Sequence, residues 1–228
     1  MASRHIWYDH PLWYYVWKPA WIPTTFGQQY SFLEELIDQW WSEITYLQKQ
    51  WSTIVLTSKS QGWYNEYGLI NRLDNDTAWL LFFAKDQPTF LLYQQKQSRG
   101  EVQKIYYADL QGNCFGQLSD QSPCIVVSTP LFHHRSDLSR MTTDPQHARW
   151  REHRVYTSIE PLFYNHTDDT TTCRIVINKW IRHQIRVHSA SLWYPIKGDR
   201  VYTPRKKPSN KNNLSWEQLH LRSMWIIA

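Results

Sequence analysis

Hydrophobic and polar positions along the chain follow patterns that predict both helices and strands. Residues 31–48 give the clearest helix, because Ser31 and Glu34 form a capping box at its start. Apolar residues then recur with the helical period, and they are Phe32, Leu33, Leu36, Ile37, Trp40, Ile44 and Leu47. Residues 182–192 are expected to form a second, shorter helix.

Short apolar or β-branched runs predict strands. They lie at residues 12–18, 53–57, 103–110, 125–128 and 174–178. A further apolar run at 79–84 is too short for its periodicity to separate helix from strand. Because strands and helices mix without a strand–helix–strand rhythm, the pattern favours an α+β fold over a doubly wound parallel sheet. The basic, proline-broken residues 203–213 predict a loop that contacts phosphate or is simply solvated.

Composition narrows the class of protein. The 228 residues are 42% hydrophobic and 20% charged, which is typical of a globular chain, and without a linker we expect a single domain over 1–228. No transmembrane run or signal peptide is found, so we expect a cytoplasmic protein without a membrane partner. The three cysteines form no zinc or disulfide pattern, and we expect no metal. The net charge of +5 weakly favours a nucleic-acid partner.

Several common catalytic motifs are absent from the sequence, among them the phosphate-binding loop, the dinucleotide fingerprint and the nucleophile elbow. The informative segment is residues 71–85, where a polar loop with Arg, Asp and Thr leads directly into an apolar run. A loop held by a rigid element can present a reactive carboxylate, here Asp74. On its own, such an aspartate is more typical of a cap or a turn.

This segment, Asn71-Arg72-Leu73-Asp74 through Ala84-Lys85, resembles the signature H-R-L-D-x-x-T-S-G-x-x-x-x-A-K of the RluA-type pseudouridine synthases. Three other segments resemble motifs of that family in the same order. Residues 15–21 resemble N-K-P-A-G, residues 104–112 resemble K-x-Y-x-A-x-x-x-G, and residues 180–202 resemble G-R-T-H-Q-I-R-V-H followed by P-I-x-G-D-x-x-Y. Leu219-His220 fits a late L-H pair, so the resemblance spans nearly the whole chain.

The resemblance implies an isomerase that converts uridine to pseudouridine in ribosomal or transfer RNA without a cofactor or metal. Asp74 would be the nucleophile, and Arg186 would pair with it and keep it ionised. Tyr106 would stack on the flipped uracil and help to remove the proton from carbon 5. The residues expected to contact RNA are Arg72, Lys18, Asn71, Lys104, Arg182 and His183. Without the resemblance, Tyr106 is more typical of a core residue and Arg186 of a structural ion pair.

The implied fold is the α+β pseudouridine synthase catalytic fold, a mixed and largely antiparallel sheet flanked by helices around a central cleft that holds Asp74. Many relatives carry a small N-terminal RNA-binding domain. Here the motifs begin near residue 15, so we expect no such domain, and a monomer whose catalytic domain recognises RNA itself.

Tryptophans stand where the family has glycines. The chain has 14 Trp and 7 Gly, whereas average composition predicts about 16 glycines. Trp21, Trp79, Trp180 and Trp193 replace motif glycines, and Trp150 and Trp225 are weaker instances of the same exchange. Trp193 follows the helix expected at 182–192 and precedes Pro195, where a left-handed glycine would end a helix, and tryptophans in place of glycines are expected to overpack their surroundings. One hypothesis is that UGA codons read as glycine in the source were translated as tryptophan.

Two other interpretations remain open. The chain could be a catalytically inactive, RNA-binding relative whose site is crowded by genuine tryptophans. It could also be a Trp-rich module that binds carbohydrate or another ligand, although its tryptophans follow the enzyme motifs rather than a platform spacing.

Overall fold

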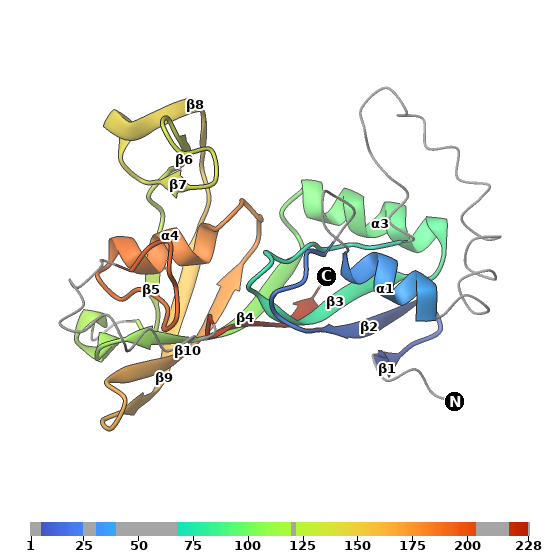
Figure 1. Cartoon of the computed structure of the whole chain (residues 1–228), viewed down its shortest axis with the longest axis horizontal. Helices are drawn as coiled ribbons and strands as arrows, with labels where there is room; N and C mark the ends of the chain where they lie inside the picture. Colours follow the sequence, from blue (N-terminus) through green and yellow to red (C-terminus); the bar gives the residue numbers. More distant parts are fainter. Residues whose placement is uncertain (1–5, 25–30, 40–67, 120–121, 204–218, 228) are drawn as a thin grey trace. The chain divides into compact units, whose positions relative to one another are not determined.

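The computed structural model describes residues 6–24, 31–39, 68–119, 122–203 and 219–227 (Figure 1). They form two compact units. The first unit comprises Met1–Val102 and Ser223–Ala228, and the second comprises Gln103–Arg222. The expectation of a single catalytic domain stays a prediction. No helix among the described residues is long and apolar enough to cross a membrane.

The sheet of the first unit contains four strands in the order β1-β2-β3-β11. They are β1 (Ile6–Asp9), β2 (Trp13–Lys18), β3 (Ala78–Ala84) and β11 (Leu221–Ile227), most of which belongs to this unit. β2 pairs antiparallel with β3, from Trp13 opposite Ala84 to Lys18 opposite Trp79. The strand predicted at 12–18 is confirmed, and the ambiguous run at 79–84 is a strand.

Helices α1 (Phe32–Gln39) and α3 (Gln87–Ser98) complete the first unit. The helix predicted at 31–48 is confirmed as far as Gln39; its remainder and the strand predicted at 53–57 lie outside the described residues. The sequence pattern did not predict α3. Its start signals are Asp86, whose Oδ1 accepts from Thr89 N at 2.8 Å, and Pro88 in its first turn.

The core of the first unit gathers aromatic side chains from β2 and β3 under α3. Tyr15, Leu80, Phe82 and Val102 are buried together, and the Phe82 and Tyr93 rings meet edge to face with centroids 4.8 Å apart. This packing fixes β2 and β3 against each other, so the loop that leads into β3 starts from a rigid element.

The larger sheet of the second unit has the order β4-β10-β9-β5 and is antiparallel throughout. Its strands are β4 (Gln103–Gln111), β10 (Thr170–Ile177), β9 (Thr157–Asn165) and β5 (Ile125–Val127). The strands predicted at 103–110, 125–128 and 174–178 are confirmed, whereas β9 was not predicted. The α+β class with a largely antiparallel sheet is likewise confirmed.

Helix α4 (Gln184–Ser191) packs on one face of this sheet, as expected for 182–192. Gln184 Nε2 donates to Thr157 Oγ1 at 3.1 Å, and His188 Nδ1 lies 2.8 Å from the same oxygen. On its other side α4 approaches a second sheet of three strands, which are β6 (Leu131–His134), β7 (Met141–Thr142) and β8 (Ala148–His153) (Figure 1). Short 3₁₀ helices η2 (Cys114–Gln117) and η3 (Pro145–His147) connect these parts.

Four tryptophans adopt a left-handed backbone that favours glycine. The φ angles are 75° at Trp21, 90° at Trp79, 67° at Trp150 and 68° at Trp193. Trp193 follows α4 directly and its N–H donates to Ala190 O at 3.0 Å, which confirms the expected left-handed helix end. Trp180 is not among the residues with positive φ, so its backbone makes no such demand.

The left-handed backbone costs about 1–2 kcal/mol at each of these bulky residues. The overpacking expected from so many tryptophans is not found at three of them, because Trp21, Trp150 and Trp193 are 51%, 65% and 84% exposed. The backbone therefore supports the hypothesis that these are glycine positions. The codon misreading itself stays a prediction.

Replacing Trp21, Trp79, Trp150 and Trp193 by glycine, one at a time, should raise the free energy of unfolding by about 1 kcal/mol each because the left-handed strain is relieved. Urea unfolding monitored by circular dichroism measures this. Trp180→Gly is the matched control and should give no gain. The strain argument fails if Trp180→Gly stabilises the chain as much as the other four exchanges.

Candidate active-site residues

Asp74 lies in the loop that precedes β3, and backbone hydrogen bonds fix this loop from both sides. Thr77 N donates to Asp74 O at 3.0 Å and closes a tight turn. Thr24 Oγ1 donates to Leu73 O at 2.7 Å and accepts from Leu73 N at 3.2 Å. Asp74 itself is partly buried. The carboxylate is therefore carried by a backbone with little freedom to move.

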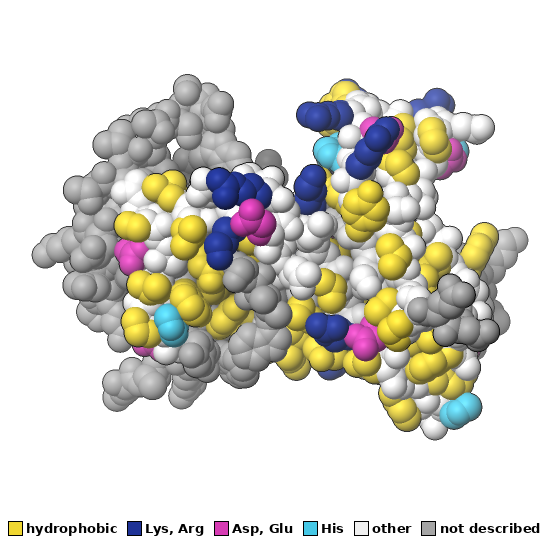
Figure 2. Space-filling model, turned by 180° about the vertical axis from the view of Figure 1, so that it is seen from behind, with side chains coloured by type: hydrophobic (Ala, Val, Ile, Leu, Met, Phe, Trp, Pro, Cys, Tyr) yellow, Lys and Arg dark blue, Asp and Glu magenta, His cyan; other side chains and the backbone are white. Residues whose placement is uncertain are grey.

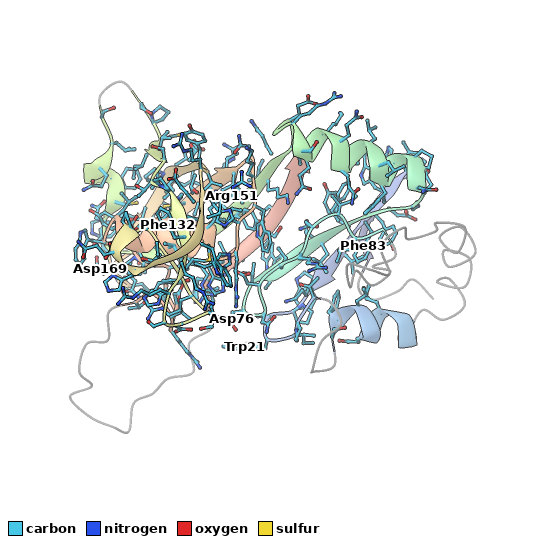
Figure 3. The ribbon with its side chains drawn as sticks, turned by 90° about the horizontal axis from the view of Figure 1, so that it is seen from above. Trp21, Asp76, Phe83, Phe132, Arg151 and Asp169 are labelled. Carbon is cyan, nitrogen blue, oxygen red and sulfur yellow. The ribbon has the colours of Figure 1, made fainter. Side chains whose placement is uncertain are left out.

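The motif at 15–21 lies directly against this loop. Trp21 N donates to Asn75 O at 2.8 Å, and Figure 3 shows Trp21 beside Asp76 at one end of the unit. Two segments that resemble separate family motifs therefore meet in the first unit, as members of one site should.

Lys18 makes the closest connection between these two segments. Its side chain is fully buried, and Nζ donates to Pro19 O at 2.9 Å, Asn75 O at 3.3 Å and Thr77 O at 3.0 Å. The expected contact of Lys18 with the RNA backbone does not fit this placement, because all three ammonium hydrogens point at the chain's own carbonyls.

Burial lowers the pKa of Lys18 from 10.5 to about 8, while the charges of Asp76 and Asp74 act in the opposite direction. The ammonium therefore bears a desolvation cost that the two nearby carboxylates reduce. It contributes a positive charge near Asp74 that favours the ionised form of that carboxylate.

Asn71 and Arg72, the other residues expected to contact RNA from this loop, differ in exposure. Asn71 is buried, and its Oδ1 accepts from Phe82 N at 2.7 Å, so it links the loop to β3. Arg72 is exposed and stays a candidate for contact with RNA.

Tyr106 and Lys104 lie on β4 in the second unit. Because β4 and β10 pair in regular register, Tyr106 and Lys104 share one face, opposite Ile175 and Ile177. Ile177 also pairs with Thr157, to which α4 is hydrogen-bonded, so this is the face that α4 covers. Tyr106 is only 3% exposed. Its predicted role as a stacking platform stays a prediction.

Lys104 is 4% exposed, and no hydrogen bond or ion pair of its ammonium is found in the part of the chain that the structure describes. Burial lowers its pKa from 10.5 to about 8. A surface contact with RNA does not fit this burial. A buried lysine on the same strand face as Tyr106 is instead a group that could change its charge near neutral pH.

Arg186 projects from α4 and forms a buried ion pair with Asp199. Nε donates to Oδ2 at 2.7 Å and Nη2 donates to Oδ1 at 2.9 Å, with side chains 3% and 0% exposed. Asp199 Oδ1 also accepts from Val201 N at 2.9 Å and Tyr202 N at 3.1 Å. Because the two carboxylate oxygens of Asp199 each accept a hydrogen bond from it, the guanidinium is held in one orientation.

His183, expected to contact RNA, belongs to the same buried network. Its Nδ1 lies 2.8 Å from the Tyr202 hydroxyl, which also accepts from Met141 N at 2.9 Å. Burial, followed by the charges of Arg186 and Arg182, lowers the pKa of His183 to about 3, so the ring is neutral. Arg182 is exposed, and its Nη1 donates to Leu138 O at 3.1 Å.

Several residues of this network were not singled out from the sequence. Asp199 and Tyr202 lie within the segment that resembles P-I-x-G-D-x-x-Y, and that fixed spacing is the signal that could have identified them. Likewise His220, of the late L-H pair, has its Nδ1 2.9 Å from Asp109 Oδ2 on β4.

The predicted site residues thus fall into two groups. Asp74, Arg72, Lys18 and Asn71 belong to the first unit, and Tyr106, Lys104, Arg186, Arg182 and His183 belong to the second. The pairing of Asp74 with Arg186 stays a prediction. The described residues contain no cluster of three or more side chains able to hold a metal ion.

Comparison with known proteins agrees with these motifs. A family model described as RNA pseudouridylate synthase matches residues 13–191. The chain belongs to the RNA pseudouridylate synthase family. This confirms the resemblance to the RluA-type enzymes, and the match includes segments of both units.

Curated relatives include an uncharacterized RNA pseudouridine synthase of Chloroflexus aurantiacus, 30% identical over 161 residues that make up 70% of this chain and 45% of the relative. Ribosomal large subunit pseudouridine synthase D of Escherichia coli is 28% identical over 148 residues, which cover 62% of this chain and 39% of that protein. The chain thus spans less than half the length of these two relatives.

Two solved human structures share the fold. RNA Pseudouridylate Synthase Domain Containing 1 has a TM-score of 0.69 at 15% identity, covering 97% of this chain and 77% of that one. RNA Pseudouridylate Synthase Domain Containing 4 has a TM-score of 0.62 at 20% identity, covering 98% and 83%. The predicted pseudouridine synthase fold is therefore confirmed.

Lys104→Met should raise the free energy of unfolding at pH 7 by about 2 kcal/mol, because it removes a buried ammonium. The folded protein loses this proton at about pH 8 and the unfolded chain at 10.5. The penalty is therefore complete below pH 8 and disappears as the pH rises to 10.5, so the gain should shrink over that interval.

Denaturant unfolding at several pH values measures this gain. Lys96→Met, on helix α3, is the control and should leave the stability unchanged at every pH. A gain for Lys104→Met that does not depend on pH would contradict the titration argument.

Proposed function

We propose that this chain isomerises specific uridines to pseudouridine in structured RNA, with Asp74 as the nucleophile. The observation that carries the proposal is the fixed loop around Asp74, where two family motifs meet through Lys18. Ribosomal RNA is the substrate to test first, because one relative is named a ribosomal large subunit pseudouridine synthase. Transfer RNA is the second. A cytoplasmic location and a monomeric state belong to the same proposal.

The reaction is an isomerisation, so it needs no net oxidant or reductant. The Asp74 carboxylate attacks the ribose or the base and the bond from uracil nitrogen 1 to ribose carbon 1′ breaks. The uracil turns, a bond forms between its carbon 5 and carbon 1′, and the bond to Asp74 breaks, which restores the free carboxylate. The proton then leaves carbon 5, and nitrogen 1 gains one. Such a rotation requires a base that has left the helix stack.

Arg186 and Tyr106 complete this scheme. Asp199 engages Nε and Nη2 of Arg186 and so fixes the plane of its guanidinium. Arg186 is the residue that would pair with the Asp74 carboxylate and keep it ionised. Tyr106, on the sheet face covered by α4, stacks on the extruded uracil and assists removal of the proton from carbon 5.

Lys18 acts as a positioning residue in this scheme. Its ammonium holds the carbonyls of Asn75 and Thr77 on either side of the turn that follows Asp74. A nucleophile displaced by about 1 Å loses roughly a hundredfold in rate. The fixed position of this loop is therefore expected to affect the rate of the chemical step more strongly than it affects the affinity for RNA.

Asp74→Asn should abolish pseudouridine formation, because an amide cannot act as the nucleophile. Asp76→Asn, an exchange of the same chemistry two residues away, is the matched control and should retain activity. The measurement is nucleoside mass spectrometry of unmodified ribosomal and transfer RNA after incubation with each protein. Pseudouridine formation by Asp74→Asn at the level of an active Asp76→Asn would remove Asp74 from its role.

The same experiment includes the chain with glycine at 21, 79, 180 and 193. If the glycine version modifies a discrete uridine and the printed chain does not, the tryptophans block a competent site. If both bind RNA and neither forms pseudouridine on any RNA, the chain is the inactive RNA-binding relative and the proposed activity is wrong.

Lys18→Met should lower kcat by roughly a hundredfold and change KM by less than about threefold, because the loop loses its position and RNA contacts remain. Lys85→Met is the control, since this lysine of the same motif pairs with Asp9 instead. Single-turnover kinetics on RNA give both constants. A rise in KM with unchanged kcat would show that Lys18 binds RNA.

A further inference from the structure

A pocket of about 530 Å³ lies in the second unit beside the small sheet, at β8 and the segment before α4. Cationic side chains line it from two separate segments: Arg151 and Arg154 from β8 and its end, and Lys179 from the segment that follows β10. Residues that approach from distant parts of the sequence form one concave, basic surface (Arg151 is labelled in Figure 3).

The charge of this pocket is not balanced by its own acid. Glu152 is its only acidic lining residue, and Arg154 Nε donates to Glu152 Oε1 at 2.6 Å. Arg151 and Lys179 are both exposed, and neither has an ion pair within the described ranges. Two positive charges therefore face the pocket without a partner, which favours an anionic ligand.

The fold does not require these cationic side chains at β8. This strand lies at the edge of the order β7-β6-β8, and the residues from Arg149 to Glu152 are exposed on both faces. Basic residues on an edge strand also discourage pairing with another chain, but that role needs no concave surface. In Figure 2, Lys and Arg side chains gather over this part of the unit.

The pocket is fixed to the helix that carries Arg186. Val155 and Ile181 line it, and both pack in the cluster that contains Val187, the residue next to Arg186. Gln184 Oε1 also accepts from Ile181 N at 3.1 Å at the start of α4. A ligand held in this pocket would therefore lie at a defined position relative to the Arg186 guanidinium.

We propose that this pocket binds a backbone phosphate of the RNA substrate, next to the nucleotide that enters at Arg186. The inference rests on the proposed function and adds a second point of attachment. A guanidinium can bind phosphate oxygens bidentately, and Lys179 supplies a second charge. Phosphate contacts set the register of a nucleic acid on a protein without reading its sequence.

The test is the salt dependence of RNA binding by Arg151→Gln/Lys179→Gln. The probe is a fluorescein-labelled RNA hairpin with uridines in its loop, and fluorescence anisotropy gives Kd over a series of salt concentrations. The double variant loses the one phosphate contact of this pocket, so the slope of log Kd against log salt should be smaller by about 1. Its affinity at low salt should fall about tenfold or more.

The matched control is Lys96→Gln/Arg99→Gln on helix α3 and its end, which removes the same charge from the other unit. This variant should bind with the slope of the unchanged protein. Equal changes of slope in both variants would overturn the proposed phosphate site, because the loss of total positive charge would then explain them. An unchanged slope in the pocket variant would overturn it as well.

Binding and turnover separate this inference from the proposed function. Pseudouridine formation is measured in parallel on ribosomal and transfer RNA. If RNA binding depends on the pocket and no RNA is modified, the phosphate site is supported and the proposed activity is wrong. If RNA is modified and the pocket variant has an unchanged KM and an unchanged salt dependence of Kd, the proposed activity is supported and the phosphate site is wrong.

Discussion

The buried ammonium of Lys18 is the interaction on which the first unit depends. It joins the end of β2 to the loop before β3 through three carbonyl acceptors, without any exposed surface. A positive charge is costly to bury, and its pKa is lowered accordingly. A lysine suits this position because its ammonium has three hydrogens to donate, one to each of the three carbonyls.

The second unit meets the same constraint differently. There Arg186 is the buried cation of the motif on α4, and a carboxylate rather than backbone carbonyls compensates its charge. Asp199 also accepts hydrogen bonds from two backbone N–H groups of the following turn, so the same carboxylate fixes the backbone at Tyr202. In each unit, a buried cation and its hydrogen-bond acceptors thus hold a segment that resembles a family motif in place.

Much of the fold could be predicted from the sequence because its signals are local. β2, β4 and β10 were expected from short apolar or β-branched runs, and the left-handed end of α4 from its position before Pro195. The partners of buried charges could not be predicted in this way. Lys18 and Thr77 are 59 residues apart, and only the pairing of β2 with β3 brings them together.

The candidate site shows the same division. The motifs identified Asp74, Tyr106 and Arg186 by resemblance, but exposure separates residues that the motifs treat alike. Asn71 and Lys104 were expected to contact RNA and are buried, because the first links its loop to Phe82 and the second faces the side of the sheet that α4 covers. Burial depends on which face of a strand meets the core.

The tryptophans with left-handed backbone have a consequence for handling the protein. Trp21, Trp150 and Trp193 present large aromatic rings to solvent, and glycine at these positions would present almost none. Exposed apolar surface promotes self-association. A chain with glycine at these three positions would therefore associate with itself less than the chain with tryptophan, and it would be the easier of the two to keep in solution at high concentration.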